Sequence, residues 1–195
     1  MIDKAFIDSH IDKLTDCVNK ASKEIINVYE GDDFGHIEKS DGSPLTIADK
    51  NANQVILDDL KSISSDISII SEETFENNQL KKLDKTYWLV DPLDGTKEFI
   101  NKTDEFTVNI ALIDNKQAIF GIVAAPVTGK VWYGSVFDKN ITEEGPVDKI
   151  RIVMSKSHKS ENDKAFLEFI DSKNINYEII EKGSSLKLCS LADNE

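Results

Sequence analysis

Three apolar segments in the middle of the chain constrain its fold more than any other feature of the sequence. They span residues 106–113, 118–125 and 130–136. Each reads as a β-strand, and the dipeptides Asp114-Asn115 and Thr128-Gly129 separate one strand from the next. Turn residues between neighbouring strands are typical of hairpins. The sequence therefore predicts an antiparallel meander in this part of the chain.

Helical and strand-like patterns occupy the regions on both sides of this meander. Apolar residues recur at three- and four-residue steps through the first thirty residues, which predicts an amphipathic helix ending near Gly31. Further helices are predicted at residues 46–60, 161–170 and 184–192, and further strands at residues 67–70, 87–90, 151–154 and 177–180. Mixed elements with a long antiparallel portion indicate an α+β fold built in layers.

Composition restricts the kind of protein that this chain can be. Its 195 residues, of which 39% are hydrophobic, suit a single domain or slightly more. The net charge of −13 argues against a nucleic-acid-binding surface, which needs clustered basic residues. No apolar run approaches the roughly 20 residues of a membrane span, and the N-terminal residues contain no apolar signal core. Cys17 and Cys189 are isolated, which suits packed side chains in a reducing compartment. We therefore expect a cytoplasmic protein.

The segment from Asp91 to Thr96 carries the most informative chemistry in the sequence. It places two carboxylates three residues apart, directly after the apolar run 87–90 and before a Gly-Thr turn. Glu72 follows another apolar run, so adjacent strands could bring three carboxylates together. Two carboxylates about 4 Å apart repel by roughly 4 kcal/mol at an effective dielectric of 20, and a divalent ion removes that penalty. Oxygen ligands of this kind predict a Mg²⁺ site, with Pro92 holding the preceding Asp in extended geometry.

Turn chemistry alone is the alternative interpretation of these residues. Asp-Pro and Asp-Gly dipeptides are common in turns, with or without a metal. An EF-hand is excluded because its loop needs acids at alternate positions and a later Glu in register. A phosphate-binding P-loop is excluded as well, because residues 124–130 end in Gly-Lys but lack its first glycine and its Ser or Thr.

Several segments resemble the motifs of one enzyme family. Residues 88–96, Trp-Leu-Val-Asp-Pro-Leu-Asp-Gly-Thr, resemble the signature of the inositol monophosphatase superfamily, the lithium-sensitive, Mg²⁺-dependent phosphatases. Lys97-Glu98-Phe99-Ile100 continues that signature as in the bacterial 3′(2′),5′-bisphosphate nucleotidases of the CysQ type. Residues 39–49, 71–73 and 183–187 match further motifs of the same branch in order and spacing. The resemblance extends over nearly the whole chain.

This resemblance implies a fold and a set of site residues. The implied fold is a layered α/β/α/β sugar-phosphatase-like fold with an antiparallel sheet, in which residues 1–145 form a metal-site domain and residues 146–195 begin a substrate-recognition domain. The implied metal ligands, for two or three Mg²⁺ ions, are Glu72, Asp91, the Leu93 carbonyl and Asp94. The implied catalytic residues, which orient and deprotonate the attacking water, are Asp49, Thr96 and Glu72. Apart from the resemblance, Asp49 reads as a helix-start carboxylate.

The resemblance also implies contacts with a substrate. The residues implied to lie at the phosphate are Leu93, Asp94, and the N–H groups of Gly95 and Thr96 at the start of a helix. The residues implied to recognise the nucleotide are Ser157, His158, Ser184 and Lys187. A solvated loop histidine and a serine helix cap with a surface lysine are the alternative interpretations of these last four.

The chain departs from the family pattern at one point. The family supplies a further metal-ligand Asp from a Trp-Asp motif downstream of the Ser-Leu-Lys segment. No residue of this sequence takes that part, and Asp193 comes too early and lacks the preceding Trp. We therefore expect the sequence to be incomplete at its C-terminus, so that the substrate-recognition domain is truncated.

The implied function is that of a Mg²⁺-dependent phosphatase acting on adenosine 3′,5′-bisphosphate. It would remove the 3′-phosphate by in-line attack of a metal-activated water, giving AMP and phosphate, and would serve sulfur assimilation. The expected partner is this small nucleotide bisphosphate, without nucleic acid or an integral membrane segment. A homodimer and a peripheral attachment to the inner membrane face stay open. The alternatives are an inositol monophosphatase or sugar bisphosphatase of the same superfamily, and a catalytically impaired metal- or nucleotide-binding fragment.

Overall fold

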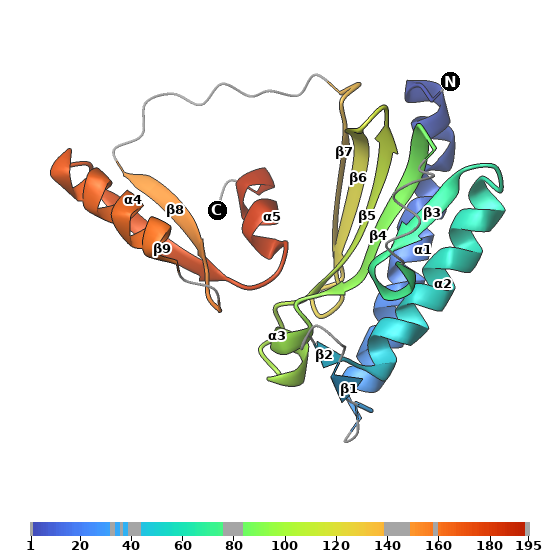
Figure 1. The fold of residues 1–195 in the computed structure, drawn as a ribbon, viewed down its shortest axis with the longest axis horizontal. Coiled ribbons are helices and arrows are strands. Elements are labelled where there is room, and N and C mark those ends of the chain that lie inside the picture. Colours follow the sequence, from blue (N-terminus) through green and yellow to red (C-terminus); the bar gives the residue numbers. More distant parts are fainter. Residues whose placement is uncertain are drawn as a thin grey trace.

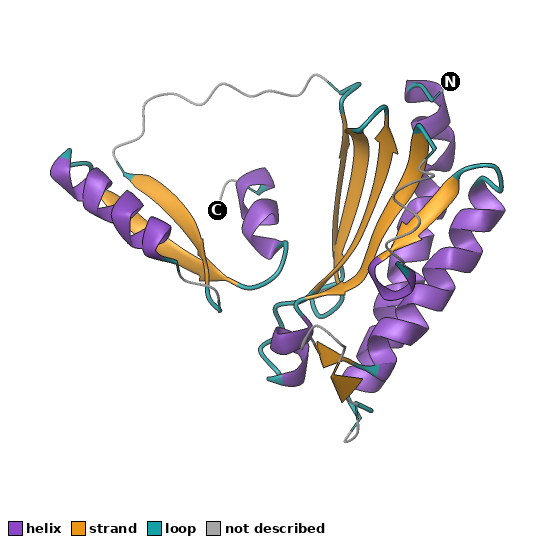
Figure 2. Cartoon of the chain, viewed as in Figure 1, coloured by secondary structure: helices purple, strands orange, loops and turns teal. Residues whose placement is uncertain are grey.

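The computed structural model describes residues 2–31, 34–35, 37–38, 44–75, 84–138, 149–157 and 160–193. Its helices are α1 (Lys4–Tyr29), α2 (Ile47–Ile63), α3 (Thr96–Ile100), α4 (Glu161–Ser172) and α5 (Leu186–Ala192), with a 3-10 turn η1 (Glu72–Thr74). Its strands are β1 (Ile37–Glu38), β2 (Pro44–Leu45), β3 (Ser68–Ser71), β4 (Thr86–Asp94), β5 (Thr107–Asp114), β6 (Gln117–Ala125), β7 (Lys130–Ser135), β8 (Ile150–Ser155) and β9 (Tyr177–Lys182). Helices and strands are mixed along the chain, as Figure 2 shows, which confirms the predicted α+β class.

Five strands form the main sheet in the order β3-β4-β5-β6-β7. From β4 to β7 each strand is antiparallel to the next, whereas β3 pairs with β4 in the parallel direction. Short turns connect β5 to β6 and β6 to β7. The meander predicted from the three central apolar segments is therefore confirmed, and two earlier strands extend it.

The hydrophobic core lies between one face of this sheet and two long helices. Figure 1 shows α1 and α2 side by side on that face. Leu14 of α1, Ile56 of α2 and Trp88 of β4 are fully buried, and each such side chain contributes roughly 1.5–3 kcal/mol relative to its exposed state. Along β4, Trp88 and Val90 point into the core while Leu89 between them is 44% exposed. This alternation, which a half-buried strand requires, fixes which side of β4 faces the helices.

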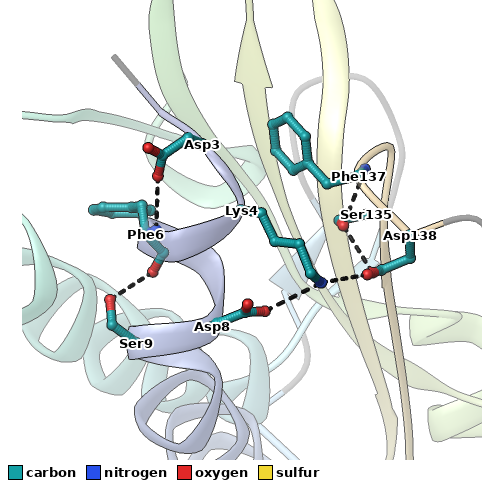
Figure 3. A network of polar contacts seen from close by, with 8 residues as sticks. All are labelled: Asp3, Lys4, Phe6, Asp8, Ser9, Ser135, Phe137 and Asp138. Atoms are coloured by element: carbon teal, nitrogen blue, oxygen red, sulfur yellow. Dashed lines mark hydrogen bonds and ion pairs between the residues drawn. The ribbon is translucent and has the colours of Figure 1, made fainter.

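Polar contacts at the start of α1 connect this helix to the end of β7 (Figure 3). Asp3 caps the helix, because its carboxylate accepts the Phe6 N–H at 3.0 Å. Lys4 lies between Asp8, at 3.4 Å, and Asp138, at 2.6 Å. The hydrogen bond from Lys4 lowers the pKa of the Asp138 carboxyl from its ordinary value. Because these charges are exposed, they orient the helix end and stabilise the fold little.

The C-terminal part of the structure is a separate βαβ unit. Strands β8 and β9 pair in the parallel direction, and α4 connects them. In Figure 1 helix α5 lies between this unit and the main sheet. The predicted domain boundary between residues 145 and 146 falls outside the described residues, so the division into residues 1–145 and 146–195 stays a prediction.

Strand β4 extends further than its apolar pattern predicts. The pattern ends the strand at Val90, whereas β4 continues to Asp94 with a change of register after Asp91. Pro92 lacks the N–H that a regular ladder needs, so the strand continues only through this irregularity. Helix α3 begins at Thr96, as the family resemblance implies, although five residues are too short to show a period of their own. The β1–β2 pair, of two residues in each strand, is missing from the sequence prediction for the same reason.

Two predictions from composition can be compared with the structure. Cys17 and Cys189 are buried free thiols, which confirms that they are packed side chains. Burial raises the pKa of the Cys17 thiol to about 12. Within the part of the chain that the structure describes, no helix is long and apolar enough to cross a membrane.

Candidate active site

The ends of β3 and β4 bring the three predicted carboxylates to one edge of the main sheet. The two strands are parallel, with Ser71 opposite Val90, so Glu72 and Asp91 follow at the same end of both strands. After the irregular register, Asp94 pairs again with β5 at this end. The condition assumed from the sequence, that adjacent strands carry Glu72, Asp91 and Asp94 to one place, is met by this topology.

The charges of these three carboxylates interact strongly. Burial, the negative charges of Glu72 and Asp94, and a hydrogen bond with Glu72 together raise the pKa of the Asp91 carboxyl to about 8. The Leu93 N–H opposes this rise by donating to Asp91 Oδ1 at 3.2 Å. In the metal-free folded protein, therefore, the Asp91 carboxyl keeps its proton to a higher pH than an ordinary aspartate does, which limits the repulsion within the cluster.

This donor set fits a hard divalent cation in its chemistry. Carboxylate and carbonyl oxygens are the ligands that Mg²⁺ takes in proteins, and a divalent charge would relieve the repulsion that now protonates Asp91. Among the described residues, no three His, Cys, Asp or Glu side chains already have the arrangement of a metal-binding group. The fit of Glu72, Asp91 and Asp94 to a cation therefore rests on oxygen chemistry and charge, and not on preformed ligand geometry.

A buried carboxylate and a hydroxyl form a second pair beside this cluster. Asp49 is 1% exposed in the first turn of α2, and its Oδ2 accepts the N–H and the hydroxyl of Thr46 at 2.7 and 2.6 Å. Its other oxygen, Oδ1, is 3.4 Å from Thr96 Oγ1, which also lies 3.2 Å from the Leu93 carbonyl oxygen. The interpretation of Asp49 as a helix-start carboxylate is therefore confirmed. Its other oxygen faces the Thr96 hydroxyl, and its catalytic role stays a prediction.

Gly95 connects β4 to α3 in a conformation that favours glycine. Its φ of 92° lies in the left-handed region, and α3 begins at the next residue. A Cβ at this position would lie 3.0 Å from the Glu105 carbonyl oxygen and 3.1 Å from Ser184 Cβ. The sharp turn places Thr96 at the first position of α3, where helix N–H groups have no partner within the helix. The predicted phosphate contacts of Gly95 and Thr96 require this arrangement.

Two residues that the sequence analysis did not select contact Asp94. The Ser185 hydroxyl donates to Asp94 Oδ2 at 2.7 Å. Asn109 Nδ2 donates to Ser185 Oγ at 3.0 Å and lies 3.4 Å from Asp94 Oδ2. Asn109 Oδ1 is buried without a hydrogen-bond partner in the described structure. Asn109 could have been selected from the sequence because it is a polar amide inside the apolar segment 106–113. No sequence pattern relates Ser185 to Asp94.

Three of the four residues predicted to recognise the nucleotide, Ser157, Ser184 and Lys187, lie around the start of α5 and the end of β8. Ser184 is buried with a φ of 46°, and its carbonyl accepts the Lys187 ammonium at 2.6 Å. The proximity of Ser184 to Gly95 brings this segment against the end of β4. The Ser157 hydroxyl donates to Glu98 Oε1. His158 lies outside the described residues, and the substrate contacts of all four residues stay predictions.

Asp193, after α5, contacts the first residues of β7. It accepts hydrogen bonds from Lys130 Nζ at 2.5 Å and from Trp132 Nε1 at 2.9 Å, both on β7. These two bonds lower the pKa of the Asp193 carboxyl. That Asp193 does not supply the further metal ligand of the family stays a prediction.

Known proteins resemble this chain over most of its length. A sequence model described as the inositol monophosphatase family matches residues 9–195. The curated 3′(2′),5′-bisphosphate nucleotidase CysQ of Shigella flexneri is 37% identical over 195 residues, which cover 95% of this chain and 77% of the relative. The protein of the same name from Buchnera aphidicola is 39% identical over 194 residues, which cover 94% of this chain and 71% of the relative.

Solved structures share its fold. CysQ from Bacteroides thetaiotaomicron, described as a bacterial member of the inositol monophosphatase family, matches with a TM-score of 0.77 at 30% identity and covers 95% of this chain and 77% of that chain. The inositol monophosphatase of Thermotoga maritima matches with a TM-score of 0.74 at 20% identity and covers 93% and 72%. The predicted layered fold with a mostly antiparallel sheet is therefore confirmed.

Proposed function

Since the chain belongs to the inositol monophosphatase family, we propose that it is a Mg²⁺-dependent phosphatase that hydrolyses adenosine 3′,5′-bisphosphate to AMP and phosphate. Curated relatives at 37–39% identity carry the name 3′(2′),5′-bisphosphate nucleotidase. Lys97 and Glu98, directly after the shared signature, favour this branch over the inositol monophosphatases. The proposed role of this reaction is in sulfur assimilation.

The observation that carries the proposal is the excess negative charge at the end of β4. Glu72, Asp91 and Asp94 are close enough for burial and mutual repulsion to raise the pKa of Asp91 to about 8. We assign these carboxylates and the Leu93 carbonyl as ligands of two or three Mg²⁺ ions. Bound Mg²⁺ supplies charge that offsets the carboxylates and stabilises the oxygens of a phosphate in displacement.

Asp49 and Thr96 are the proposed proton-handling pair. The Thr96 hydroxyl lies within 3.4 Å of Asp49 Oδ1, so it can donate its proton to that carboxylate while it accepts one from the attacking water. Asp49 keeps its orientation because its other oxygen is bound by Thr46. The proposed reaction forms no covalent intermediate with the protein, since water is the nucleophile.

The substrate is proposed to lie between the end of β4 and the segment around Ser184. The N–H groups of Gly95 and Thr96 would bind the phosphate that is removed, with Leu93 and Asp94 beside it. Ser184, Lys187 and the Ser157-His158 pair would bind the nucleoside and the second phosphate. Because the chain carries a net charge of −13, the local cations would have to offset its repulsion of an anionic substrate.

Phosphate release from a panel of substrates tests this function. The panel contains adenosine 3′,5′-bisphosphate, inositol 1-phosphate and fructose 1,6-bisphosphate, each assayed with Mg²⁺, with Mg²⁺ plus lithium, and with a chelator. The proposal expects Mg²⁺-dependent, lithium-sensitive release of the 3′-phosphate, with AMP as the product. Preference for inositol 1-phosphate or fructose 1,6-bisphosphate would overturn the substrate assignment. Absence of release from all three substrates would favour a catalytically impaired protein.

We also propose a cytoplasmic homodimer. Light scattering after size-exclusion chromatography measures the assembly, and a monomer mass would contradict it. Cell fractionation measures the location, and recovery with the membrane fraction that is reversed by salt would indicate peripheral attachment instead.

A further inference from the structure

Glu98 of α3 is a buried carboxylate outside the catalytic set described above. It is 8% exposed, and its Oε1 accepts a hydrogen bond from the Ser157 hydroxyl, which follows β8. A buried carboxylate without a partner is costly, so this bond stabilises the approach of the β8 end to α3.

Glu105, between α3 and β5, binds the same C-terminal unit through two other groups. Its Oε2 accepts the Gly183 N–H at 3.1 Å and the Lys156 ammonium at 3.2 Å. Lys156 follows β8 and Gly183 follows β9, and these parallel strands end together because Ser155 is opposite Lys182. Glu98 and Glu105, here called the glutamate pair, therefore hold both strand ends of the βαβ unit.

The packing around Gly183 shows how closely the βαβ unit approaches the glutamate pair. A Cβ at Gly183 would lie 2.7 Å from Glu98 Cγ and 3.1 Å from Glu105 Cβ. These atoms belong to the inner parts of held side chains, so a larger residue could not be accommodated without moving the glutamate pair. The next residue, Ser184, reaches the end of β4 at Gly95. The position of Ser184 thus depends on contacts made one residue earlier.

We propose that Glu98 and Glu105 are positioning residues that set the distance between the Asp91–Thr96 segment and the nucleotide-recognition residues Ser184 and Lys187. This inference rests on the proposed function for the identity of the substrate. The glutamate pair acts through the C-terminal unit and does not touch the reacting phosphate. Its loss weakens binding of the nucleotide part and leaves the hydrolytic step at the carboxyl cluster intact.

Steady-state kinetics with two phosphate esters test the proposal. The substrates are adenosine 3′,5′-bisphosphate and p-nitrophenyl phosphate, which has no nucleoside or second phosphate. For Glu98→Ala and Glu105→Ala we expect KM for the nucleotide to rise about tenfold or more, the effect of losing hydrogen bonds to a charged group. We expect kcat, and kcat/KM for p-nitrophenyl phosphate, to stay within about threefold of the wild type. Glu168→Gln removes an exposed charge from α4 of the same unit and is the matched control.

Two further variants separate positioning from a loss of folding. Glu98→Gln keeps an acceptor for Ser157 and should restore most of the lost affinity. Gly183→Ala removes no hydrogen-bonding group but forces the glutamate pair to move, so it should raise KM for the nucleotide like Glu98→Ala. An equal fall of kcat for both substrates in the alanine variants would overturn the proposal, as would failure of Glu98→Gln to restore affinity.

Hydrogen exchange provides a readout that does not depend on the substrate. Loss of the glutamate pair should increase amide exchange at residues 150–157 and 177–193 and leave β4, β5 and β6 unchanged. Unchanged exchange in the C-terminal unit would refute the positioning role even if the wild type hydrolyses the nucleotide. Conversely, a wild type that fails to hydrolyse adenosine 3′,5′-bisphosphate refutes the proposed function, and the exchange result still decides whether the glutamate pair holds the unit.

Discussion

The raised pKa of Asp91 predicts that the metal-free protein loses stability as the pH rises through neutrality. Its carboxyl has a pKa of about 8 in the folded chain and an ordinary value of 3.8. The folded state therefore binds one proton more than the unfolded state between these values. This contribution to stability is fully present below about pH 4 and is lost as the pH rises towards 8.

The size of this effect follows from proton linkage. A difference of one bound proton changes the free energy of unfolding by at most about 1.4 kcal/mol per pH unit. For a chain of this size, the melting temperature would fall by roughly 3–6 °C for each unit. Thermal melts in a chelator between pH 5 and pH 8 measure this slope for the wild type and for Asp91→Asn, which cannot ionise.

The informative quantity is the difference between these two proteins. The free energy of unfolding of the wild type minus that of Asp91→Asn should fall by about 3 kcal/mol at most between pH 5 and pH 7, because only the wild type carries the carboxyl that titrates. Asp66→Asn, an exposed carboxylate before β3, is the control and should keep the wild-type slope. Because Mg²⁺ has to displace the Asp91 proton, its stabilising effect on the wild type should grow with pH. A wild-type slope equal to that of Asp91→Asn would refute the electrostatic reasoning.

Three further predictions concern the end of β4. Asp94→Asn should lower kcat by about 10²-fold or more while the circular dichroism spectrum is unchanged, and a wild-type rate would contradict its role as a ligand. Thr96→Val should lower kcat by about 10²–10⁴-fold, since it removes the hydroxyl beside Asp49; a change confined to KM would exclude proton handling. Gly95→Ala should cost about 1–2 kcal/mol in urea unfolding because of its left-handed backbone, and unchanged stability would show that the turn can relax.

Most of the fold could be predicted because its elements are long and regular. The periodic apolar residues of α1 and the central meander follow from local patterns that tertiary contacts only confirm. The end of β4 could not be predicted, because Pro92 and the following Asp-Gly usually signal a turn. Here the pairing with β5 continues past the irregularity, so tertiary pairing prevails over turn propensity.

The candidate site likewise contains residues that the sequence could relate to one another and residues that it could not. Asp91, Asp94 and Thr96 are close in sequence, so a single strand end and turn hold them together. Asp49 could be related to Thr96 through family resemblance but not through pattern, because 47 residues separate them. Their approach depends on how α2 packs beside β4.

The sequence by itself determined the oxygen-rich character of residues 91–96, and their resemblance to a family signature led from there to the prediction of a cation and a phosphate. Only the tertiary structure decided what surrounds that chemistry. Ser185 lies 91 residues from Asp94, and Ser157 lies 59 residues from Glu98. Such hydrogen bonds have no local signature, because they form only once sheet pairing and the βαβ unit bring distant strand ends together.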